Sequence, residues 1–387
     1  MLNVLHIIGT FNTGGIQKFV LQLISSECLN EFNHQVVSTI LHKGNYKVEY
    51  EKNNIKLTHL PFTFSPKTYI PHRIDKQLRF LLSKLYFFRM LYYLGKSEID
   101  IVHSHIPSQI ISQILATIFA GKRIIWTIHG EYSLSRLTIW FLRILESALP
   151  NTKFQIIADS IPALHSTIPY TVKNPKPDNI IRTGIEIEPY LQKYDKSIIR
   201  EKYNIEDDII IIGSTGRIVW QKRYDQLISL LENYNFNEKK YHFLIAGEGS
   251  LRNKLITEVK KQKLHRHITF IGNIKNIPEF LSAIDIYIQP SATEGFPLSV
   301  LEAMAAGLPI ICSDAGGLKE MIHHNETGII YKSGDLSALY EGFIKMFSML
   351  PDELCQLGRN ARKIVQDKYS INNCSLHYNT IYNLDKK

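Results

Sequence analysis

Short apolar runs alternate with longer amphipathic stretches along most of the chain, and this alternation predicts parallel sheets covered by helices. The strands expected in the first half are Val4–Ile8, His34–Ile40, Ile55–His59, Ile101–His105, Ile124–Ile128, Phe154–Ala158 and Ile180–Arg182. Those expected in the second half are Ile209–Ile212, His242–Ala246, Ile268–Ile271 and Ile286–Pro290. Ligands of such sheets bind at the carboxyl ends of the strands, so polar residues there are the first candidates for a site.

The pattern restarts in the middle of the chain, which points to two domains. A charged stretch, Lys193–Asp208, separates the last strand signal of the first half from a new apolar strand. A length of 387 residues is also ample for two cores. We therefore expect domains at residues 1–185 and 186–368, with the hinge near Gly184–Tyr190.

Residues 294–302 join a glycine turn to a helix start and carry two carboxylates, Glu294 and Glu302. Proline suits a first helical turn, so the helix is expected from Pro297, with apolar residues at spacings of three and four behind it. Glu302 lies about 40° from that apolar stripe and is expected to face a cleft. Helix N–H groups suit phosphate or a hydroxyl, and the carboxylates suit the hydroxyls of a ribose and a sugar. We interpret the stretch as a sugar-nucleotide site; the alternative is an acidic turn with a solvated helix glutamate.

A second glycine turn follows the strand that opens the second half. Gly216 is followed by Arg217 and, five residues later, by Lys222. Arginine holds phosphate with a bidentate fork and lysine supplies a point charge, so this pair is a candidate diphosphate clamp. The alternative is ordinary surface charge.

A glycine turn and two histidines lie at or after the ends of strands in the first half. The turn containing Gly14 and Gly15 follows the first strand and precedes a helix, but it matches neither the dinucleotide nor the P-loop spacing. His105 and His129 end two further strands, where an imidazole can orient a hydroxyl or donate to a developing charge. A zinc site is less favoured, because no third ligand has a recognisable spacing.

The formal charge of +9 is concentrated in the first half. Residues 1–185 hold 20 basic and 11 acidic side chains, a difference of 9, whereas residues 186–387 hold 25 of each. Much of the excess lies in the amphipathic segment Lys67–Lys96, which predicts either docking to an anionic membrane or a core helix with a solvated basic face. Nucleic acid is disfavoured as a partner, because no recognised binding module accompanies the charge. Four dispersed cysteines favour the reducing cytoplasm, and no run has the apolar length of a spanning helix.

The stretch 294–302, with Gly307–Ile322 and Asn325–Gly328 after it, resembles the E-x7-E region of retaining glycosyltransferases with the GT-B architecture, particularly the large fourth family. The resemblance extends over nearly the whole chain. Gly216 to Lys222 resembles the family's G-R-x(4)-K segment, although Arg223 replaces the usual glycine. The family resemblance implies two Rossmann-like domains facing across a cleft, and a closing helix at about 369–387 that rejoins the first domain.

This resemblance also implies a function and a set of site residues. The expected reaction transfers a sugar, with retention, from a nucleotide-diphosphate sugar to a hydroxyl of a glycan or lipid-linked glycan in bacterial surface-polysaccharide synthesis. A UDP-sugar is the expected donor. No metal or other cofactor is expected, since no D-x-D segment is found. The expected catalytic residues are His129, Arg217, Lys222 and Glu294; the acceptor side holds Gly14, His105 and His129. The expected donor-binding residues are Gly15, Gly216, Arg217, Lys222, Gly272, Asn273, Ile274, Glu294, Gly295, Phe296, Pro297, Leu298, Ser299 and Glu302.

Two alternatives stay open at this point. One is a non-catalytic scaffold that binds a sugar nucleotide or glycan, and the other is a nucleotide-sugar epimerase of the same architecture. The expected location is the cytoplasm, with possible attachment to the inner face of the plasma membrane.

Overall fold

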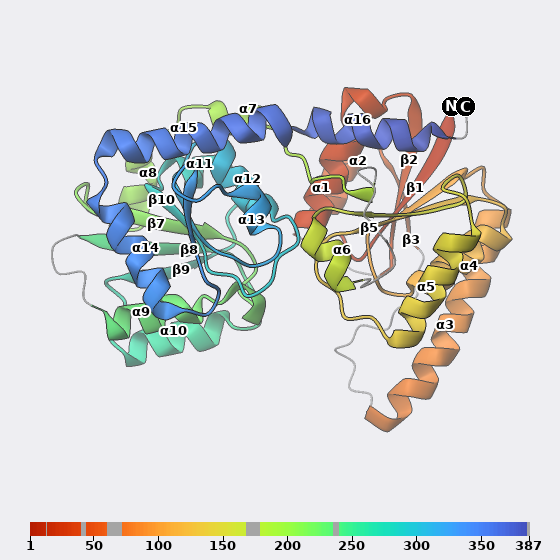
Figure 1. Ribbon diagram of the computed structural model, residues 1–387, viewed down its shortest axis with the longest axis horizontal. Helices are drawn as coiled ribbons and strands as arrows, with labels where there is room; N and C mark the ends of the chain where they lie inside the picture. The colour runs from red at the N-terminus through yellow and green to blue at the C-terminus, as the bar shows by residue number, and fades with distance from the viewer. Residues whose placement is uncertain (13, 40–43, 60–71, 168–178, 235–239, 385–387) are drawn as a thin grey trace. The chain divides into compact units, whose positions relative to one another are not determined.

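A computed structural model describes the chain except for residues 13, 40–43, 60–71, 168–178, 235–239 and 385–387 (Figure 1). The chain forms two compact units. Unit 1 comprises Met1–Gly184 and Ile371–Lys387, and unit 2 comprises Ile185–Ser370. Each unit contains one six-stranded sheet in which all strand pairs are parallel.

Unit 1 follows the predicted alternation of strands and helices. Its strands are β1 (Leu2–Ile8), β2 (Phe32–Ser38), β3 (Lys56–His59), β4 (Ile101–Ser104), β5 (Arg123–Ile128) and β6 (Phe154–Ala158). Its helices are α1 (Gly15–Ile24), η1 (Glu27–Leu29), α2 (Asn45–Lys52), α3 (His72–Gly95), α4 (Ile110–Phe119), α5 (Arg136–Ala148), α6 (Ile161–Thr167) and α16 (Ile371–Tyr382). The strand order β3-β2-β1-β4-β5-β6 places the topological switch point between β1 and β4.

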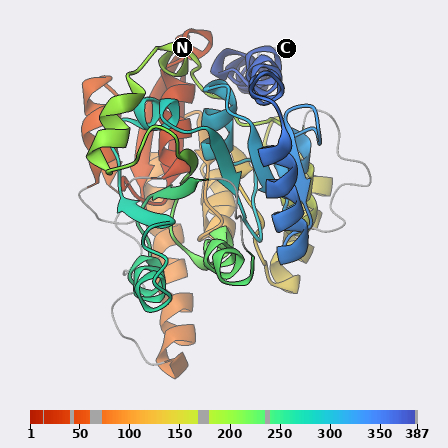
Figure 2. The same ribbon diagram turned by 90° about the vertical axis from the view of Figure 1, so that its left-hand side faces the viewer.

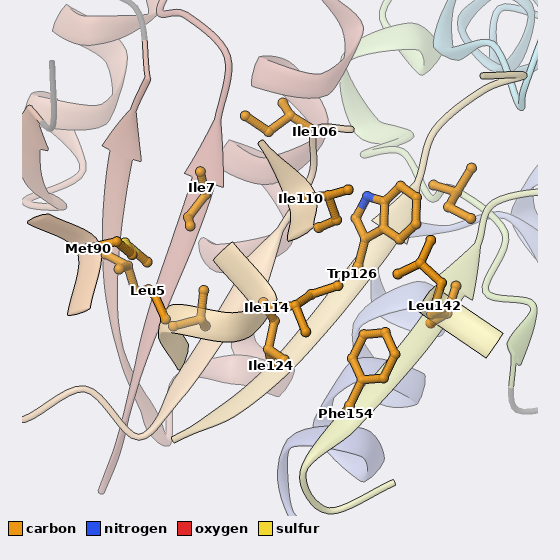
Figure 3. Packing of buried hydrophobic residues seen from close by; sticks show 14 of the residues in the cluster. Leu5, Ile7, Met90, Ile106, Ile110, Ile114, Ile124, Trp126, Leu142 and Phe154 are labelled. Atoms are coloured by element: carbon orange, nitrogen blue, oxygen red, sulfur yellow. The ribbon is translucent and has the colours of Figure 1, made fainter. Parts of the chain in front are cut away.

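The two faces of the unit 1 sheet have different chemistry because side chains alternate along each strand. Leu5 and Ile7 face the hydrophobic core against the layer of α3, α4 and α5, together with Trp126 and Leu142 (Figures 1 and 3). The intervening His6 is buried but belongs to a polar layer on the other face.

Helix α16 completes that second face. The Tyr382 hydroxyl lies 2.6 Å from His103 Nδ1, and the Tyr378 hydroxyl lies 3.1 Å from Thr127 Oγ1. The buried guanidinium of Arg123 donates to the Ile381 carbonyl at 2.7 Å. Residues from the end of the chain therefore satisfy polar groups that the first strands bury, as burial requires.

Unit 2 repeats the architecture. Its strands are β7 (Ile210–Thr215), β8 (Tyr241–Ala246), β9 (Ile268–Gly272), β10 (Ile286–Gln289), β11 (Ile310–Ser313) and β12 (Gly328–Tyr331). Its helices are α7 (Glu188–Leu191), α8 (Lys196–Lys202), η3 (Trp220–Lys222), α9 (Asp225–Asn233), α10 (Arg252–Lys261), α11 (Ile277–Ser282), α12 (Leu298–Ala305), α13 (Leu318–Met321), α14 (Leu336–Ser348) and α15 (Pro351–Lys368). The order β12-β11-β10-β7-β8-β9 places its switch point between β7 and β10.

Helices cover both faces of the unit 2 sheet. Helices α9, α10 and α14 lie on one face, whereas α8, α11, α12 and α15 lie on the other (Figures 1 and 2). The core on the α9 side includes Leu227, Phe243, Ile311 and Phe343. Both sheets are thus covered as parallel sheets require, and the predicted α/β class with two Rossmann-like domains is confirmed.

The predicted strands are confirmed with one exception. Ile180–Arg182 is not a strand; Ile180 makes only an isolated bridge to Ala158. Strand β11 was expected only from the family resemblance of Gly307–Ile322, and strand β12 had no prediction. Helix α3 confirms the predicted helical segment, of which Lys67 lies outside the described residues.

Helix α15 supports α12, the helix that carries Glu302. The Arg362 guanidinium donates to the carbonyls of Ala305 and Ala306, at 2.9 and 2.6 Å, and so satisfies the last turn of α12. The two helices approach closely at Gly358, where an added Cβ would lie 1.9 Å from the Gly307 carbonyl oxygen. Only glycine fits there without a shift of backbone.

Gly358→Ala is expected to lower the free energy of unfolding by about 2 kcal/mol or more, because the new methyl group meets backbone rather than a mobile side chain. The measurement is urea unfolding followed by circular dichroism. Gly95→Ala is the matched control, since nothing lies within 4 Å of an added Cβ there. Equal unfolding midpoints for the two variants would contradict the close packing of α15.

Candidate functional site

Two loops meet at the switch point of unit 2, one after β7 and one after β10. The Ala292 N–H donates to the Gln221 carbonyl at 2.7 Å, which joins them directly. The Thr215 N–H, at the end of β7, lies 3.2 Å from the buried hydroxyl of Tyr287 in β10. Lys222 and Glu294, on the two loops, are thereby brought together although 72 residues separate them.

The Lys222–Glu294 ion pair is the centre of this site. Lys222 Nζ lies 2.6 Å from Glu294 Oε1, and the two side chains are only 13% and 11% exposed. The same oxygen accepts hydrogen bonds from Ser291 Oγ at 2.5 Å and from Gln289 Nε2 at 2.9 Å. Three donors hold one carboxylate oxygen, so the orientation of Glu294 is fixed before any ligand arrives.

Glu302 is buried, although the helical wheel places it beside the apolar stripe rather than within it. Its side chain is 6% exposed, and Oε1 accepts a hydrogen bond from the Tyr190 hydroxyl at 3.1 Å. Helix α12 begins at Leu298 after Pro297, as predicted to within one residue, but nearly all of its residues are buried. A helical wheel shows only the position of Glu302 on its own helix. Tyr190, which contacts Glu302, belongs to another helix, α7.

The other predicted donor-side residues occupy the same edge of the sheet. Gly216 follows β7 with φ +153°, and Gly272 ends β9 with φ +77°, conformations that favour glycine. Asn273 is exposed and Ile274 half-buried directly after Gly272. The buried Gly295 and Phe296 and the half-buried Ser299 surround the start of α12, where Ser299 Oγ lies 3.5 Å from Gln289 Oε1.

Arg217 and Arg223 differ from Lys222 in their surroundings. Arg217 is exposed, and its side chain has no hydrogen bond or ion pair within the described residues. Arg223 adopts a left-handed conformation, with φ 49° and ψ 37°, and its Nε lies 3.1 Å from Asp225 Oδ2. The loop therefore has a backbone shape that suits glycine, even though this chain carries arginine.

The predicted residues of unit 1 also gather at strand ends. Gly14 precedes α1 in an extended conformation with φ −177°, and Gly15 is the first residue of that helix. His105 Nδ1 and His129 Nε2, after β4 and β5, lie 3.0 Å apart. The His129 side chain is 6% exposed and its Nδ1 lies 3.7 Å from Asp159 Oδ2, after β6.

His6, His103 and His105 each bring a ring nitrogen within 4.8 Å of the others, a spacing that suits a metal ion. His6 is a third candidate ligand that sequence spacing did not reveal. All six ring nitrogens, however, have a hydrogen-bonding partner in the protein. Burial lowers the pKa of all three rings well below the usual range, so they are neutral and satisfied without an ion.

Sequence reasoning missed five residues at these two sites: Gln289, Ser291, Tyr190, Asp159 and His6. Gln289, Ser291 and Asp159 share one available signal, because each is the last residue of a strand or follows it closely. Tyr190 lacked such a signal, since 112 residues separate it from Glu302.

Comparison with known families decides what this arrangement is. The model of the family described as Glycosyl transferases group 1 matches residues 195–364, and that of Glycosyltransferase Family 4 matches residues 13–188. The chain belongs to this glycosyltransferase family. It is therefore a glycosyltransferase, and the predicted family is confirmed.

Individual relatives agree with this membership. The O-antigen biosynthesis glycosyltransferase WclY of Escherichia coli is 28% identical over 294 residues, which cover 73% of this chain and 79% of the relative. A glycosyltransferase from Rickettsia africae superposes with a TM-score of 0.81 at 20% identity, covering 100% and 99% of the two chains. HepE of Anabaena in complex with UDP-glucose has a TM-score of 0.79 at 17% identity and covers 99% and 100%. These two structures show the shared fold.

Arg223→Gly is expected to be more stable than Arg223→Ala by about 1 kcal/mol, because both lack the contact with Asp225 and only glycine adopts the left-handed region without strain. Chemical unfolding of the two variants measures the difference. Alanine as stable as glycine would contradict the backbone conformation of this glycosyltransferase loop.

Proposed function

We propose that the protein transfers a sugar, with retention of configuration, from a UDP-sugar to a hydroxyl of a glycan or lipid-linked glycan during bacterial cell-surface polysaccharide synthesis. The observation that carries this proposal is the partly buried Lys222–Glu294 pair at the switch point of unit 2. Support for the substrates comes from WclY, which acts in O-antigen biosynthesis, and from HepE, which binds UDP-glucose.

The donor diphosphate is proposed to lie over the loops after β7 and β10. Arg217 is exposed there with its guanidinium unengaged by described side chains, so it offers a bidentate contact to phosphate. Lys222 supplies a second cation whose position Glu294 fixes at 2.6 Å. The N–H groups at the start of α12 add a third source of positive potential. Together these groups stabilise the charge that develops on the leaving diphosphate.

The two glutamates are proposed to bind hydroxyls rather than to attack the sugar. Glu294 Oε1 already accepts from three donors, which lowers its nucleophilicity and argues against a covalent intermediate on it. Glu302 is proposed to accept from the ribose hydroxyls while the Tyr190 hydroxyl holds Oε1 in place. A two-carboxylate glycosidase mechanism is therefore not proposed.

Neither a metal nor another cofactor is part of the proposal. Two cationic side chains and a helix N-terminus supply the charge stabilisation that a divalent ion provides in other transferases. The roles of unit 1 are proposed as well: Gly14 and His105 lie on the acceptor side, and Gly15 and His129 lie near the donor sugar.

The test is nucleotide release by the purified protein with a panel of UDP-, GDP- and ADP-sugars, with and without membrane lipid extract and with EDTA present throughout. We expect release from one UDP-sugar that the extract stimulates, and a fall of roughly 100-fold in Arg217→Gln. Glu302→Gln should also reduce release, and it keeps an oxygen to accept from Tyr190. Lys254→Gln, on the outer helix α10, is the control and should leave release unchanged.

Each other outcome has a definite meaning. Binding without release in any extract would favour a non-catalytic scaffold, and interconversion of the free sugar nucleotide without acceptor would favour an epimerase. Full loss with EDTA, restored by a divalent ion, would overturn metal independence.

Peripheral contact of unit 1 with an anionic membrane is the second part of the proposal. Among the helices in the described part of the chain, none has the length and apolar character needed to cross a bilayer. Two helices of one layer nevertheless expose apolar stripes at spacings of three and four. Helix α3 exposes Leu85, Phe88 and Tyr92, and α5 exposes Leu137, Trp140 and Ile144. The exposed basic residues Lys84, Arg89 and Arg136 flank these stripes and favour anionic headgroups.

Phe88→Ser combined with Trp140→Ser is expected to reduce co-sedimentation with equimolar phosphatidylcholine–phosphatidylglycerol vesicles at least tenfold, because each substitution removes an exposed anchor. Ile198→Ser, an equally exposed apolar position in unit 2, is the control. Binding that is the same for both variants, or equal on pure phosphatidylcholine, would contradict the membrane contact.

A further inference from the structure

Strand β10 of unit 2 and the residues just after it alternate between apolar and polar side chains. Ile286 and Ile288 belong to the hydrophobic core on the α9 side. The alternate positions, Tyr287, Gln289 and, just beyond the strand, Ser291, are polar and fully buried. Strand β10 lies between β7 and β11, so its backbone is held on both sides. Burying a row of polar groups in the middle of a sheet costs free energy unless partners satisfy them, so their partners indicate what the row does.

The carboxamide of Gln289 uses all of its hydrogen-bonding capacity inside the protein. Its Nε2 donates to Glu294 Oε1 at 2.9 Å and to Ser291 Oγ at 2.8 Å. Its Oε1 accepts from the Tyr287 hydroxyl at 3.3 Å, and Ser299 Oγ lies 3.5 Å from the same oxygen. An ionised carboxylate can only accept, so the amide nitrogen must be the atom that faces Glu294.

Tyr287 holds the oxygen end of this amide. Its hydroxyl accepts from the Thr215 N–H, at the end of β7, at 3.2 Å. The hydroxyl proton is then shared between the Thr215 carbonyl, at 3.2 Å, and Gln289 Oε1. Burial raises the pKa of Tyr287 above its usual value, so the hydroxyl keeps this proton. Gln289 is thereby fixed against two neighbouring strands.

Gln289 reaches Glu294 by two routes. One is its direct hydrogen bond, and the other passes through Ser291 Oγ, which accepts from Gln289 and donates its own proton to Glu294 Oε1 at 2.5 Å. Lys222 Nζ binds the same oxygen. Glu294 Oε2, by contrast, makes no hydrogen bond within the described part of the chain. The protein groups thus all hold one oxygen of the carboxylate and leave the lone pairs of the other unused.

We propose that Gln289 is a positioning residue for the donor sugar: by holding Glu294 Oε1, directly and through Ser291, it makes Oε2 the oxygen that accepts from a sugar hydroxyl. This inference rests on the proposed role of Glu294 in the transferase. Gln289 has no exposed surface, so it acts only through Glu294. Ser299 lies in the first turn of α12, the proposed diphosphate site, so the same amide also sets the position of Oε2 relative to that turn.

Lys222 alone does not determine which oxygen of Glu294 is left for the sugar. A lysine ammonium is a point charge on a flexible stem and can pair with either oxygen of a carboxylate. Gln289 and Ser291 are shorter side chains on a central strand and its continuation, so their geometry selects Oε1. Removing the amide should therefore weaken recognition of the sugar but not of the diphosphate, because Arg217 and Lys222 stay in place.

The test compares the wild type with Gln289→Met, which keeps the length of the side chain but has no donors, in equilibrium binding of UDP and of a UDP-sugar. The sugar probe is whichever of UDP-glucose, UDP-galactose and UDP-N-acetylglucosamine the wild type binds most tightly. We expect the Kd of the UDP-sugar to rise roughly tenfold in Gln289→Met and the Kd of UDP to stay unchanged. An unchanged Kd for the UDP-sugar in the folded variant, or an equal loss for UDP, overturns the proposal.

Gln226→Met is the matched control. Gln226, in α9 of the same unit, is also buried, and its Oε1 accepts from the Tyr331 hydroxyl at 3.3 Å, the distance at which Gln289 accepts from Tyr287. This variant should leave both Kd values unchanged. Ser291→Ala removes only one hydroxyl and serves as the second variant should Gln289→Met fail to fold. It is expected to raise the Kd of the UDP-sugar alone, and an unchanged Kd would again overturn the proposal.

A further arm separates positioning from direct contact with the sugar. In a Glu294→Ala background, adding Gln289→Met should leave the Kd of the UDP-sugar where it is, because no carboxylate remains to be positioned. An additional loss of sugar affinity in that background overturns the proposal. Failure of the wild type to bind any of these nucleotides would instead overturn the proposed function, so the two failures are distinguishable.

Discussion

The parallel direction of every strand is the constraint on which both candidate sites depend. In each sheet it brings all carboxyl strand ends to one edge, and the order of strands opens a switch point there. Lys222 and Glu294 meet at that edge in unit 2, as His105 and His129 do in unit 1. Neither pair is close in sequence, and both are assembled by strand order alone.

Burial of charge is the second constraint, and the two units meet it differently. In unit 2 a cation and hydrogen-bond donors surround the carboxylate of Glu294. Glu302, which is more deeply buried, has the hydroxyl of Tyr190. In unit 1 the buried carboxylate of Asp159 lies beside His129, whose Nδ1 is 3.7 Å from Oδ2. Leaving any of these groups unpaired would cost several kcal/mol, so partners and charges must be fixed together.

Much of the fold could be predicted from the sequence because apolar strands such as Ile124–Ile128 and Ile286–Gln289 carry a strong local signal. The strand at Gly328–Tyr331 was not predicted; it directly follows a turn, and its place in the sheet is given by its pairing with β11. Site residues at strand ends could be predicted for the same reason, whereas the residues that contact them could not. Tyr190 and Asp159 are defined by contacts across the fold, which no spacing in the sequence encodes.

The return of α16 to unit 1 has a consequence for the order of events during synthesis. Unit 2 is contiguous, from Ile185 to Ser370, and can become compact as soon as those residues have left the ribosome. Unit 1 is begun first, but the hydrogen bonds of His103 and Arg123 to Tyr382 and Ile381 cannot form until the end of the sequence has been made. The polar layer of unit 1 therefore stays incomplete while about two hundred further residues are translated. A nascent chain of this kind is open to chaperone binding over its first half for most of its synthesis.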